Sequence, residues 1–573
     1  MSEARQPSTA SDASRTLAEL ADRYWDGALA AQPVFATSIG DRRFDDRLRP
    51  NGPGAAAAEI AWLEGLEAEV RGIPTDGLDP SELVTRDELL DRMRADRDLV
   101  GAGIEAWMVD PLDGPQVALL NIPAFQPIHS IEDGEALLAR WREMGPWVDR
   151  LTATSRAALA SGVASPQALV RSVIAELDDL FARPIDDWPL LEPASALPED
   201  WSGERREAIV QAIRSAVADG TAPALARYRT FLVDELGPRA RGDDQPGLSS
   251  VPGGAEAYAA LVRAHTTLDL GPTEIHRIGL DETERIDAEF RALGARLLGT
   301  ADQATILARL RADPALHFAT SAEVRAVAED ALDRASGAIA GWFGRLPKAP
   351  CIVVEMPDHE AVHSTIAYYR QPAADGSRPG SYYINTSAPE TRPRYEAETL
   401  AFHEAVPGHH LQLAIAQELD GLPAFRRFHG PTAFIEGWAL YSERLSVEMG
   451  LLSEPLAAFG VASFDAWRAC RLVVDTGLHA LGWSRDRAIT FMLEHTALAE
   501  NNITNEVDRY LAIPGQALAY KLGQREILRL RDAASRRLGP GFDIRAFHDV
   551  VLGSGAVGLG TLGTLVEAWL ADR

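Results

Sequence analysis

The residues best suited to chemistry lie close together in one short run of the sequence. It reads His403-Glu404-Ala-Val-Pro407-Gly-His409-His410-Leu-Gln. A His followed directly by Glu is how the HExxH helix of zinc hydrolases begins. There a second His, four residues on, lies on the same face, and the Glu acts as general base. In this chain the fourth position after His403 is Pro407, which cannot bind a metal. The run therefore predicts a zinc site only if the second ligand comes from further along the chain.

Pro407 itself provides a way to bring a later histidine into place. In a regular helix, at about 100° per residue, His409 would lie about 240° around the axis from His403, and His410 would lie about 10.5 Å along it. Neither could share a zinc ion with His403, because Zn–N bonds are about 2.0–2.1 Å long. Proline lacks an N–H and clashes with the preceding turn, so the helix must kink or bulge. The kink must take up fewer extra residues to bring His409 to the position of the second ligand than to bring His410 there. We therefore expect His409 to be the second ligand, with His410 as the alternative.

The third ligand is expected in the segment Phe434-Ile-Glu436-Gly-Trp-Ala-Leu-Tyr-Ser-Glu443. Glu436 follows His409 at a distance that allows a loop and the start of another helix. Its neighbours are mostly apolar, so its carboxylate is expected to be buried, where a charged group needs a partner. Glu443, seven residues later, falls on the same helical face. It is expected to hold a ligand in place or to orient a water molecule.

A polar stretch on an apolar background, near the C-terminal end, is expected to complete the site. Amide hydrolysis needs a hydrogen-bond donor for the oxyanion and often a cation for a substrate carboxylate. Tyr510 and Tyr520 are the candidate donors, and Arg509 and Lys521 are the candidate cations. Gln516, which follows a Pro-Gly turn, is a further candidate for substrate binding.

Other residues join the candidates from separate segments. Asp475 and His479, four residues apart, are expected to form a hydrogen-bonded pair on one helix, with Asp475 supporting the site and His479 facing the substrate. Tyr383, in an aromatic run, is a candidate substrate contact. The run His359–His363 could form a second metal patch, although a surface or substrate-facing role is favoured for it.

The elements that must position these residues are mostly helices. Apolar residues recur every three to four positions at about 55–72, 80–103, 133–160, 165–182, 203–235 and 254–295, and again from Tyr395 almost to the end. Short β-branched and aromatic runs at 351–356 and 380–385 predict strands. The expected fold is mostly α (α+β), a large helical metallopeptidase-like fold with a small β-sheet preceding the metal-binding helix. An edge strand of that sheet could pair with an extended substrate backbone.

The same patterns predict three regions along the chain. Residues 1–14 are polar and are expected to be disordered. Residues 15–345 are expected to form a mostly helical region that makes one wall of a cleft. Residues 346–573 are expected to form the catalytic region, with the small sheet and the zinc-binding helices.

Composition narrows the class of partner. The chain has 573 residues with a net charge of −28, which argues against binding nucleic acid or an anionic membrane surface. It also disfavours acidic substrates, unless a local basic pocket overrides the overall field. The two cysteines suit a reducing compartment, and no apolar signal core or 18-residue apolar run is present, so a cytoplasmic location is expected. The sequence predicts no particular oligomeric state.

On these residues the chain resembles the bacterial family DUF885, whose mark is His-Glu-Ala-x-Pro-Gly-His-His-x-Gln, matched here by residues 403–412. Residues 436–441, 509–521 and 24–40 also resemble family segments. The family is similar to the gluzincin metallopeptidases, in which two His and a downstream Glu hold zinc, and Glu436-Gly resembles the turn that supplies their third ligand. The resemblance implies a mostly helical peptidase fold with a small sheet, and it leaves the substrate open.

These expectations combine into a zinc-dependent hydrolase of peptide or small amide substrates. His403, His409 and Glu436 would bind one zinc ion per chain, and Glu404 would act as general base for the attacking water. Tyr520 or Tyr510 would stabilise the oxyanion. Two alternatives stay open at this point: a zinc amidase or deacylase acting on a non-peptide small molecule, and a helical binding protein without activity.

Overall fold

The structure, a computed structural model, describes residues 11–356, 365–373, 376 and 378–573. Helix makes up 71% of it, and a three-stranded sheet accompanies the helices. The prediction of a mostly α fold with a small sheet is therefore confirmed.

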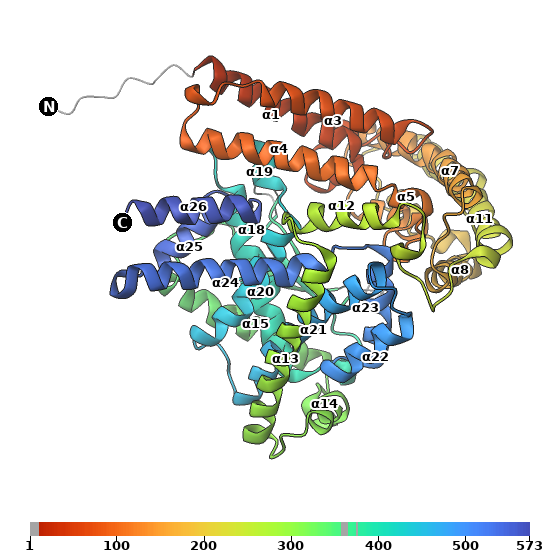
Figure 1. The fold of residues 1–573 in the computed structure, drawn as a ribbon. Coiled ribbons are helices and arrows are strands. Elements are labelled where there is room, and N and C mark those ends of the chain that lie inside the picture. The colour runs from red at the N-terminus through yellow and green to blue at the C-terminus, as the bar shows by residue number, and fades with distance from the viewer. Residues whose placement is uncertain (1–10, 357–364, 374–375, 377) are drawn as a thin grey trace.

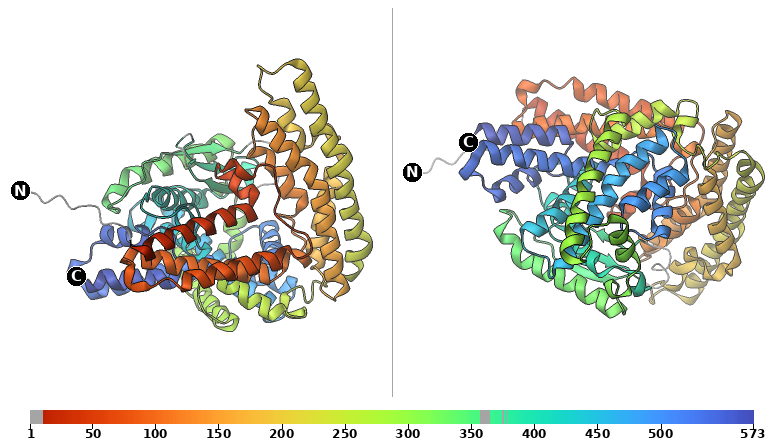
Figure 2. Two further views of the ribbon diagram at one scale, coloured as in Figure 1. Left: turned by 90° about the horizontal axis from the view of Figure 1, so that it is seen from above. Right: turned by 60° about the horizontal axis from the view of Figure 1, so that its bottom comes forward.

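The first part of the chain forms two groups of helices (Figures 1 and 2). α1, α3 and α4 run along one side of the molecule, and α7, α8 and α11 stand together as a slab, which is clearest in the left view of Figure 2. The helices are α1 (Asp12–Ala31), α2 (Pro33–Ser38), α3 (Ala55–Arg71), α4 (Pro80–Gly101), α5 (Ile104–Trp107), α6 (Pro115–Asn121), α7 (Ile131–Ala160), α8 (Gln167–Ala182), α9 (Glu192–Ser195), α10 (Gly203–Ser215) and α11 (Ala222–Phe231).

Local sequence signals explain where several of these helices begin. The side chain of Asp79 accepts a hydrogen bond from the backbone of Glu82, whose own side chain accepts one from the backbone of Asp79. This capping box satisfies backbone donors that an α-helix leaves open at its N-terminus, and Pro80 supplies a fixed first residue. The same reciprocal pair starts α7, at Ser130 and Asp133.

The middle of the chain leads from helices into the sheet. Its helices are α12 (Gly254–Thr266), α13 (Pro272–Leu297), α14 (Gln303–Ala312) and α15 (Ser321–Ala338). The strands are β1 (Cys351–Glu355), β2 (Ala367–Arg370) and β3 (Gly380–Ile384), in the order β1-β3-β2. β3 is parallel to β1 and antiparallel to β2. The two strands expected from the sequence are therefore parallel neighbours, with the second in the centre, and β1 and β2 form the edges.

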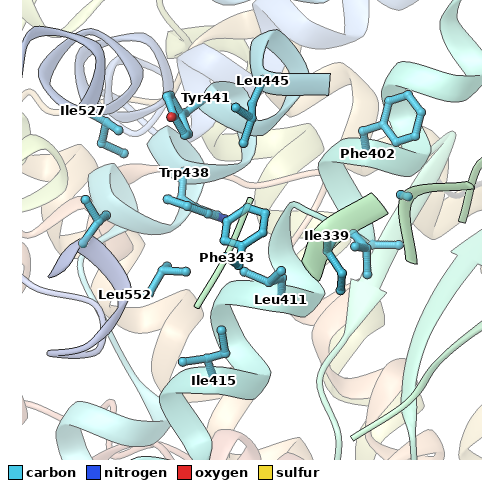
Figure 3. Packing of buried hydrophobic residues seen from close by; sticks show 14 of the residues in the cluster. Ile339, Phe343, Phe402, Leu411, Ile415, Trp438, Tyr441, Leu445, Ile527 and Leu552 are labelled. Carbon is cyan, nitrogen blue, oxygen red and sulfur yellow. The ribbon is translucent and has the colours of Figure 1, made fainter. Parts of the chain in front are cut away.

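The helices that follow the sheet are α17 (Arg394–Glu404), α18 (His409–Gln417), α19 (Ala424–Phe428), α20 (Thr432–Glu448), α21 (Ala458–His479), α22 (Arg485–His495), α23 (Glu500–Ala512), α24 (Leu518–Leu538), α25 (Ile544–Leu552) and α26 (Leu559–Ala571). Of these, α17, α18, α20, α24, α25 and α26 pack around one large apolar core. Figure 3 shows Phe402 of α17, Leu411 of α18 and Trp438 of α20 in this core, and all three are fully buried. The core therefore fixes three helices whose neighbouring residues are candidates for chemistry.

Candidate metal centre

The helix that carries His403 ends one residue later. α17 stops at Glu404, and α18 begins at His409, the residue expected to be the second ligand. The turn between the two helices contains Pro407, so the chain is interrupted where the sequence predicts an interruption. A regular helix would have placed the two histidines on different faces.

Neighbouring side chains hold this turn in place. The carbonyl oxygen of Pro407 accepts hydrogen bonds from Trp438 Nε1 at 3.0 Å and from Ser442 Oγ at 3.1 Å, both on α20. A Cβ atom on Gly408 would collide with the last carbonyl oxygens of α17, so this position needs glycine. The turn is thereby tied to the helix that carries Glu436.

Three side chains from three helices converge at the turn. His403 Nε2 lies 3.6 Å from Glu436 Oε2, and His409 Nε2 lies 3.5 Å from the same oxygen. One ligand atom from each residue lies within 4.8 Å of the others. A tetrahedral zinc site with bonds of about 2.0–2.1 Å separates its ligand atoms by about 3.4 Å. The buried Oε2 of Glu436 has no hydrogen-bond partner among the described residues. Two imidazoles and a carboxylate in this arrangement fit a zinc ion.

Glu443 orients His403 within the cluster. Its Oε1 lies 2.7 Å from His403 Nδ1, and both side chains are buried. Burial lowers the pKa of His403, but the carboxylates of Glu436 and Glu443 raise it by a larger amount, so the pKa is about 9. Burial also disfavours ionisation of Glu436, yet the adjacent His409 and His403 hold its pKa well below the ordinary value. A carboxylate behind a ligand histidine is the usual way in which proteins fix the ring and its tautomer.

His410 lies away from the cluster. Its Nδ1 is 2.9 Å from the hydroxyl of Tyr369 on β2, and its Nε2 is 3.1 Å from the carbonyl oxygen of Ala349. Burial lowers the pKa of this imidazole to about 4. Because both ring nitrogens are already engaged, the geometry favours His409 over His410 as the second ligand. His410 instead ties α18 to the sheet.

Glu404 follows His403 directly along the chain. Its carboxylate is partly buried, and no described residue forms a hydrogen bond or an ion pair with it. Burial, with the charge of Glu404 as a further contribution, raises the pKa of Tyr382 well above its ordinary value. Tyr382, on β3, therefore lies close to this carboxylate. An unpaired carboxylate beside a metal ligand is suited to accept a proton.

The hydroxyl of Tyr510 is occupied by protein groups. It donates to Glu506 Oε2 at 2.8 Å, and it accepts from Arg471 Nε at 3.0 Å and from Trp467 Nε1 at 3.1 Å. Burial raises the pKa of the phenol strongly, and Glu506 adds to this. Its one proton is committed to Glu506, so Tyr510 does not present a donor to an oxyanion.

The remaining candidates of this stretch, Arg509, Gln516 and Tyr520, differ in whether protein groups already occupy them. Arg509 donates to Gln516 Oε1 at 2.6 Å and to Glu506 at 3.2 Å, so the two candidate substrate contacts bind each other. Tyr520 is partly buried, with the guanidinium of Arg471 4.4 Å from its ring centroid. No described residue forms a hydrogen bond with the Tyr520 hydroxyl. Tyr520 is therefore the better of the two candidate oxyanion donors.

Comparison with known proteins places the chain in a family. A family model described as "Bacterial protein of unknown function (DUF885)" matches residues 33–566. The chain belongs to this family. The similarity to gluzincin peptidases suggested by the sequence stays a prediction. Among curated proteins, no sequence matches.

Two solved structures share the DUF885 fold. One is described as a "putative lipoprotein" from Colwellia psychrerythraea. It is 28% identical, with a TM-score of 0.89, over 99% of this chain and 100% of the other. The second, a "putative lipoprotein of unknown function" from Shewanella oneidensis, is 17% identical, with a TM-score of 0.75, over 96% and 99%. In the described part of this DUF885 chain, no helix is long and apolar enough to span a bilayer.

Lys521 is not available as a substrate cation in this DUF885 protein. Its ammonium group is 1% exposed and contacts Asp465 Oδ1, Gln524 Oε1 at 2.7 Å and Glu282 Oε2 at 3.4 Å. Three acceptors use the three donor hydrogens of an ammonium group. Lys521 and Asp465 also line a cavity of about 510 Å³, which none of His403, His409 and Glu436 lines. The sequence-based assignment of Lys521 to the substrate is therefore corrected: it belongs to a separate buried ion cluster.

Asp475 and His479 are not bonded to each other. Asp475 accepts hydrogen bonds from the backbone N–H of Gly515 at 3.1 Å and from the hydroxyl of Tyr258 at 2.5 Å, which holds the Pro-Gly turn. His479 lies within 2.9 Å of the backbone carbonyl of Tyr510, is fully buried, and has its pKa lowered to about 3 by burial. Both residues position the stretch that leads to Tyr520. The expected substrate contact of His479 is corrected, because both its ring nitrogens are engaged inside the protein.

Tyr383 lies on β3, and its ring stacks on that of Tyr368 at 4.7 Å. Neighbouring side chains of a strand point to opposite faces. Tyr383 therefore lies on the face of the sheet away from Tyr382, the tyrosine of β3 on which the charge of Glu404 acts, and its contact with a substrate stays a prediction. The suggested patch His359–His363 lies outside the described residues.

The sequence analysis missed Arg468. This side chain is 5% exposed, and neither Nε nor Nη1 has a hydrogen-bond partner among the described residues. Burial lowers its pKa, against the opposing charges of Glu443 and Glu436, so the guanidinium lies near the metal cluster. A signal was available, because Arg468 and Arg471 interrupt an otherwise apolar run in α21.

Proposed function

We propose that this DUF885 protein is a zinc-dependent hydrolase that cleaves amide bonds of peptides. The observation that carries the proposal is the convergence of His403 Nε2, His409 Nε2 and Glu436 Oε2 from three helices, next to the unpaired carboxylate of Glu404. A zinc ion bound there would polarise the scissile carbonyl and lower the pKa of a water molecule. A carboxylate ligand with two histidines matches the donor set of catalytic zinc sites.

The residues of the chain divide the remaining work. Glu404 accepts a proton from the attacking water and returns it to the leaving amine, so that one carboxylate serves both halves of the reaction. Tyr520 donates a hydrogen bond to the carbonyl oxygen as negative charge develops on it. Glu443 keeps the Nε2 of His403 turned toward the other two ligands.

The test compares turnover by the zinc-loaded protein on a peptide library and on acylated small amides, with Glu404→Gln alongside. Peptide cleavage that is lost in Glu404→Gln, while zinc is retained, supports the proposal. Cleavage of small amides alone would replace the peptidase by an amidase or deacylase. If Glu404→Gln keeps both its zinc and the full turnover, the proposed chemistry is wrong.

A further inference from the structure

Two arginines on α21 are buried without a full set of partners. Arg468 is 5% exposed, and Arg471 is 2% exposed. Among the described residues, no acceptor lies within hydrogen-bonding distance of the buried Nε and Nη1 of Arg468 or of the buried Nη1 of Arg471. Burying a guanidinium is costly unless its donors are satisfied. Donors left open at a buried position are therefore expected to meet an acceptor that the protein itself does not supply.

Both guanidinium groups stack on the faces of aromatic rings. Arg468 lies 4.1 Å from the ring centroid of Trp467 and 4.6 Å from that of Phe464. Arg471 lies 4.5 Å from the same Trp467 ring and 4.4 Å from that of Tyr520. Stacking fixes the plane of a guanidinium and leaves its N–H edge for an acceptor. The two side chains are thus preorganised rather than loosely placed.

Helix α21, which carries both arginines, packs against α17, which carries His403. The charges of Glu436, a candidate ligand, and of Glu443, which orients His403, both act on Arg468. Tyr520, the candidate oxyanion donor, acts on Arg468 and stacks against Arg471. Arg468 therefore lies within reach of the charges of the candidate site, on a helix that packs against α17.

The guanidinium groups in this region outnumber the carboxylates that form direct ion pairs with them. Glu506 pairs with Arg471 at 2.9 Å and with Arg509 at 3.2 Å, so one carboxylate serves two guanidinium groups. Arg468 has no ion pair with a described residue. A buried guanidinium without a direct carboxylate partner can accept an acidic substrate group, although the net charge of −28 disfavours such groups elsewhere on the chain.

We propose that Arg468, supported by Arg471, binds a free carboxylate of the substrate. This inference rests on the proposed function and narrows it: the preferred substrates carry a carboxylate next to the scissile amide, as a peptide with a free C-terminus or an N-acyl amino acid does. Arginine binds a planar carboxylate through two parallel N–H···O bonds, which lysine cannot reproduce. Lys521, whose three donors are taken up by protein groups, is excluded from this role, and Arg509 already pairs with Glu506 and Gln516.

The test measures binding to the zinc-loaded full chain by calorimetry, with two matched hydroxamates. One carries a carboxylate next to the group that replaces the scissile amide, and the other carries a primary amide there. Wild type is expected to bind the carboxylate probe about 10- to 100-fold more tightly, as a charge-assisted pair in a buried site allows. In Arg468→Met the two probes are expected to bind about equally, and in Arg468→Lys the preference is reduced. Arg156→Met, which removes a guanidinium from the distant α7, serves as control and keeps the wild-type preference.

The possible failures can be told apart. If wild type binds zinc and both hydroxamates with equal affinity, the carboxylate proposal is overturned while the proposed hydrolase stands. If wild type binds no zinc, both the proposed hydrolase and the proposed carboxylate binding are wrong. If Arg468→Met does not fold, the affinities of wild type and of Arg468→Lys for the two hydroxamates still test the proposal. An unchanged preference in Arg468→Lys and Arg468→Met would also refute the assignment. With substrates, loss of Arg468 should raise KM for the free acid and leave that for the amide unchanged.

Discussion

Glu443 Oε1 lies 2.7 Å from Nδ1 of His403, and the opposite nitrogen of the same ring faces Glu436 at 3.6 Å. One buried carboxylate thus sets the direction of a ligand that lies 40 residues earlier in the chain. Glu443→Gln is expected to weaken zinc binding by about 10- to 100-fold, because the ring loses its orientation and basicity. Competition with a fluorescent chelator measures this. Glu448→Gln, on the exposed side of the same helix, is the matched control.

The choice between the two adjacent histidines is open to a direct comparison. His409→Ala is expected to lose zinc, because it removes one of three converging ligand atoms. His410→Ala is expected to keep zinc and to lose stability, because the Tyr369 hydroxyl and the Ala349 carbonyl lose their partner. Metal analysis and thermal unfolding of both variants give the answer. Loss of zinc in His410→Ala alone would reverse the assignment.

Glu404→Gln is expected to keep its zinc and to lose activity by about 10²- to 10⁴-fold, as the loss of a general base does. The amide is nearly isosteric and no described residue pairs with Glu404, so the fold should be unaffected. Retained zinc with normal melting separates a chemical defect from a structural one. Activity within twofold of wild type would assign the base to another residue.

Zinc uptake should depend on pH through His403. Its pKa is about 9 in the metal-free protein, because Glu436 and Glu443 outweigh the effect of burial. The ordinary value is about 6.5. Protonation therefore stabilises the metal-free fold fully below about pH 6.5, and this contribution is lost as the pH rises through 9.

Zinc must displace that proton, so zinc affinity is expected to rise about tenfold per pH unit between pH 7 and 9. Calorimetry in buffers of different ionisation enthalpy measures the protons released, with one expected near pH 7. A flat affinity over this range, or no proton release, would contradict the assignment of His403 as a ligand.

Gly437 controls how closely the ligand helix approaches its neighbour. A Cβ atom there would lie 2.5 Å from the backbone of Gly523, where α20 and α24 meet. Gly437→Ala is expected to separate the two helices and to cost about 1–3 kcal/mol. It should also weaken zinc binding, because Glu436 is the preceding residue. Gly65→Ala in α3, where nothing lies within 4 Å, is the control and should be neutral or slightly stabilising. Chemical denaturation of both variants measures the difference.

The sequence predicted the parts of the site that depend on short-range covalent and steric effects. Pro407 must interrupt a helix wherever it occurs, so the break before His409 could be inferred without coordinates. Helical stretches at 55–72 and 133–160 were likewise recovered as α3 and α7, because their apolar period is local. The stretch at 254–295 contains a break after Thr266 that the periodicity does not reveal.

Roles that depend on distant partners could not be predicted in this way. Tyr510 and Tyr520 are equivalent candidates by type, and only Glu506, Trp467 and Arg471 around the first hydroxyl separate them. Lys521 has a charge suited to a substrate but is held by Asp465, 56 residues earlier. The pairing of β1 with β3 likewise depends on contacts that a pattern of single residues does not contain.

X-ray diffraction from crystals of the zinc-loaded protein, recorded at the zinc absorption edge, tests the central claim most directly. The account predicts one anomalous peak per chain, about 2.0–2.2 Å from His403 Nε2, His409 Nε2 and a carboxylate oxygen of Glu436. Absence of a peak at this place in zinc-soaked crystals, or a peak coordinated by His410 in place of His409, would contradict it.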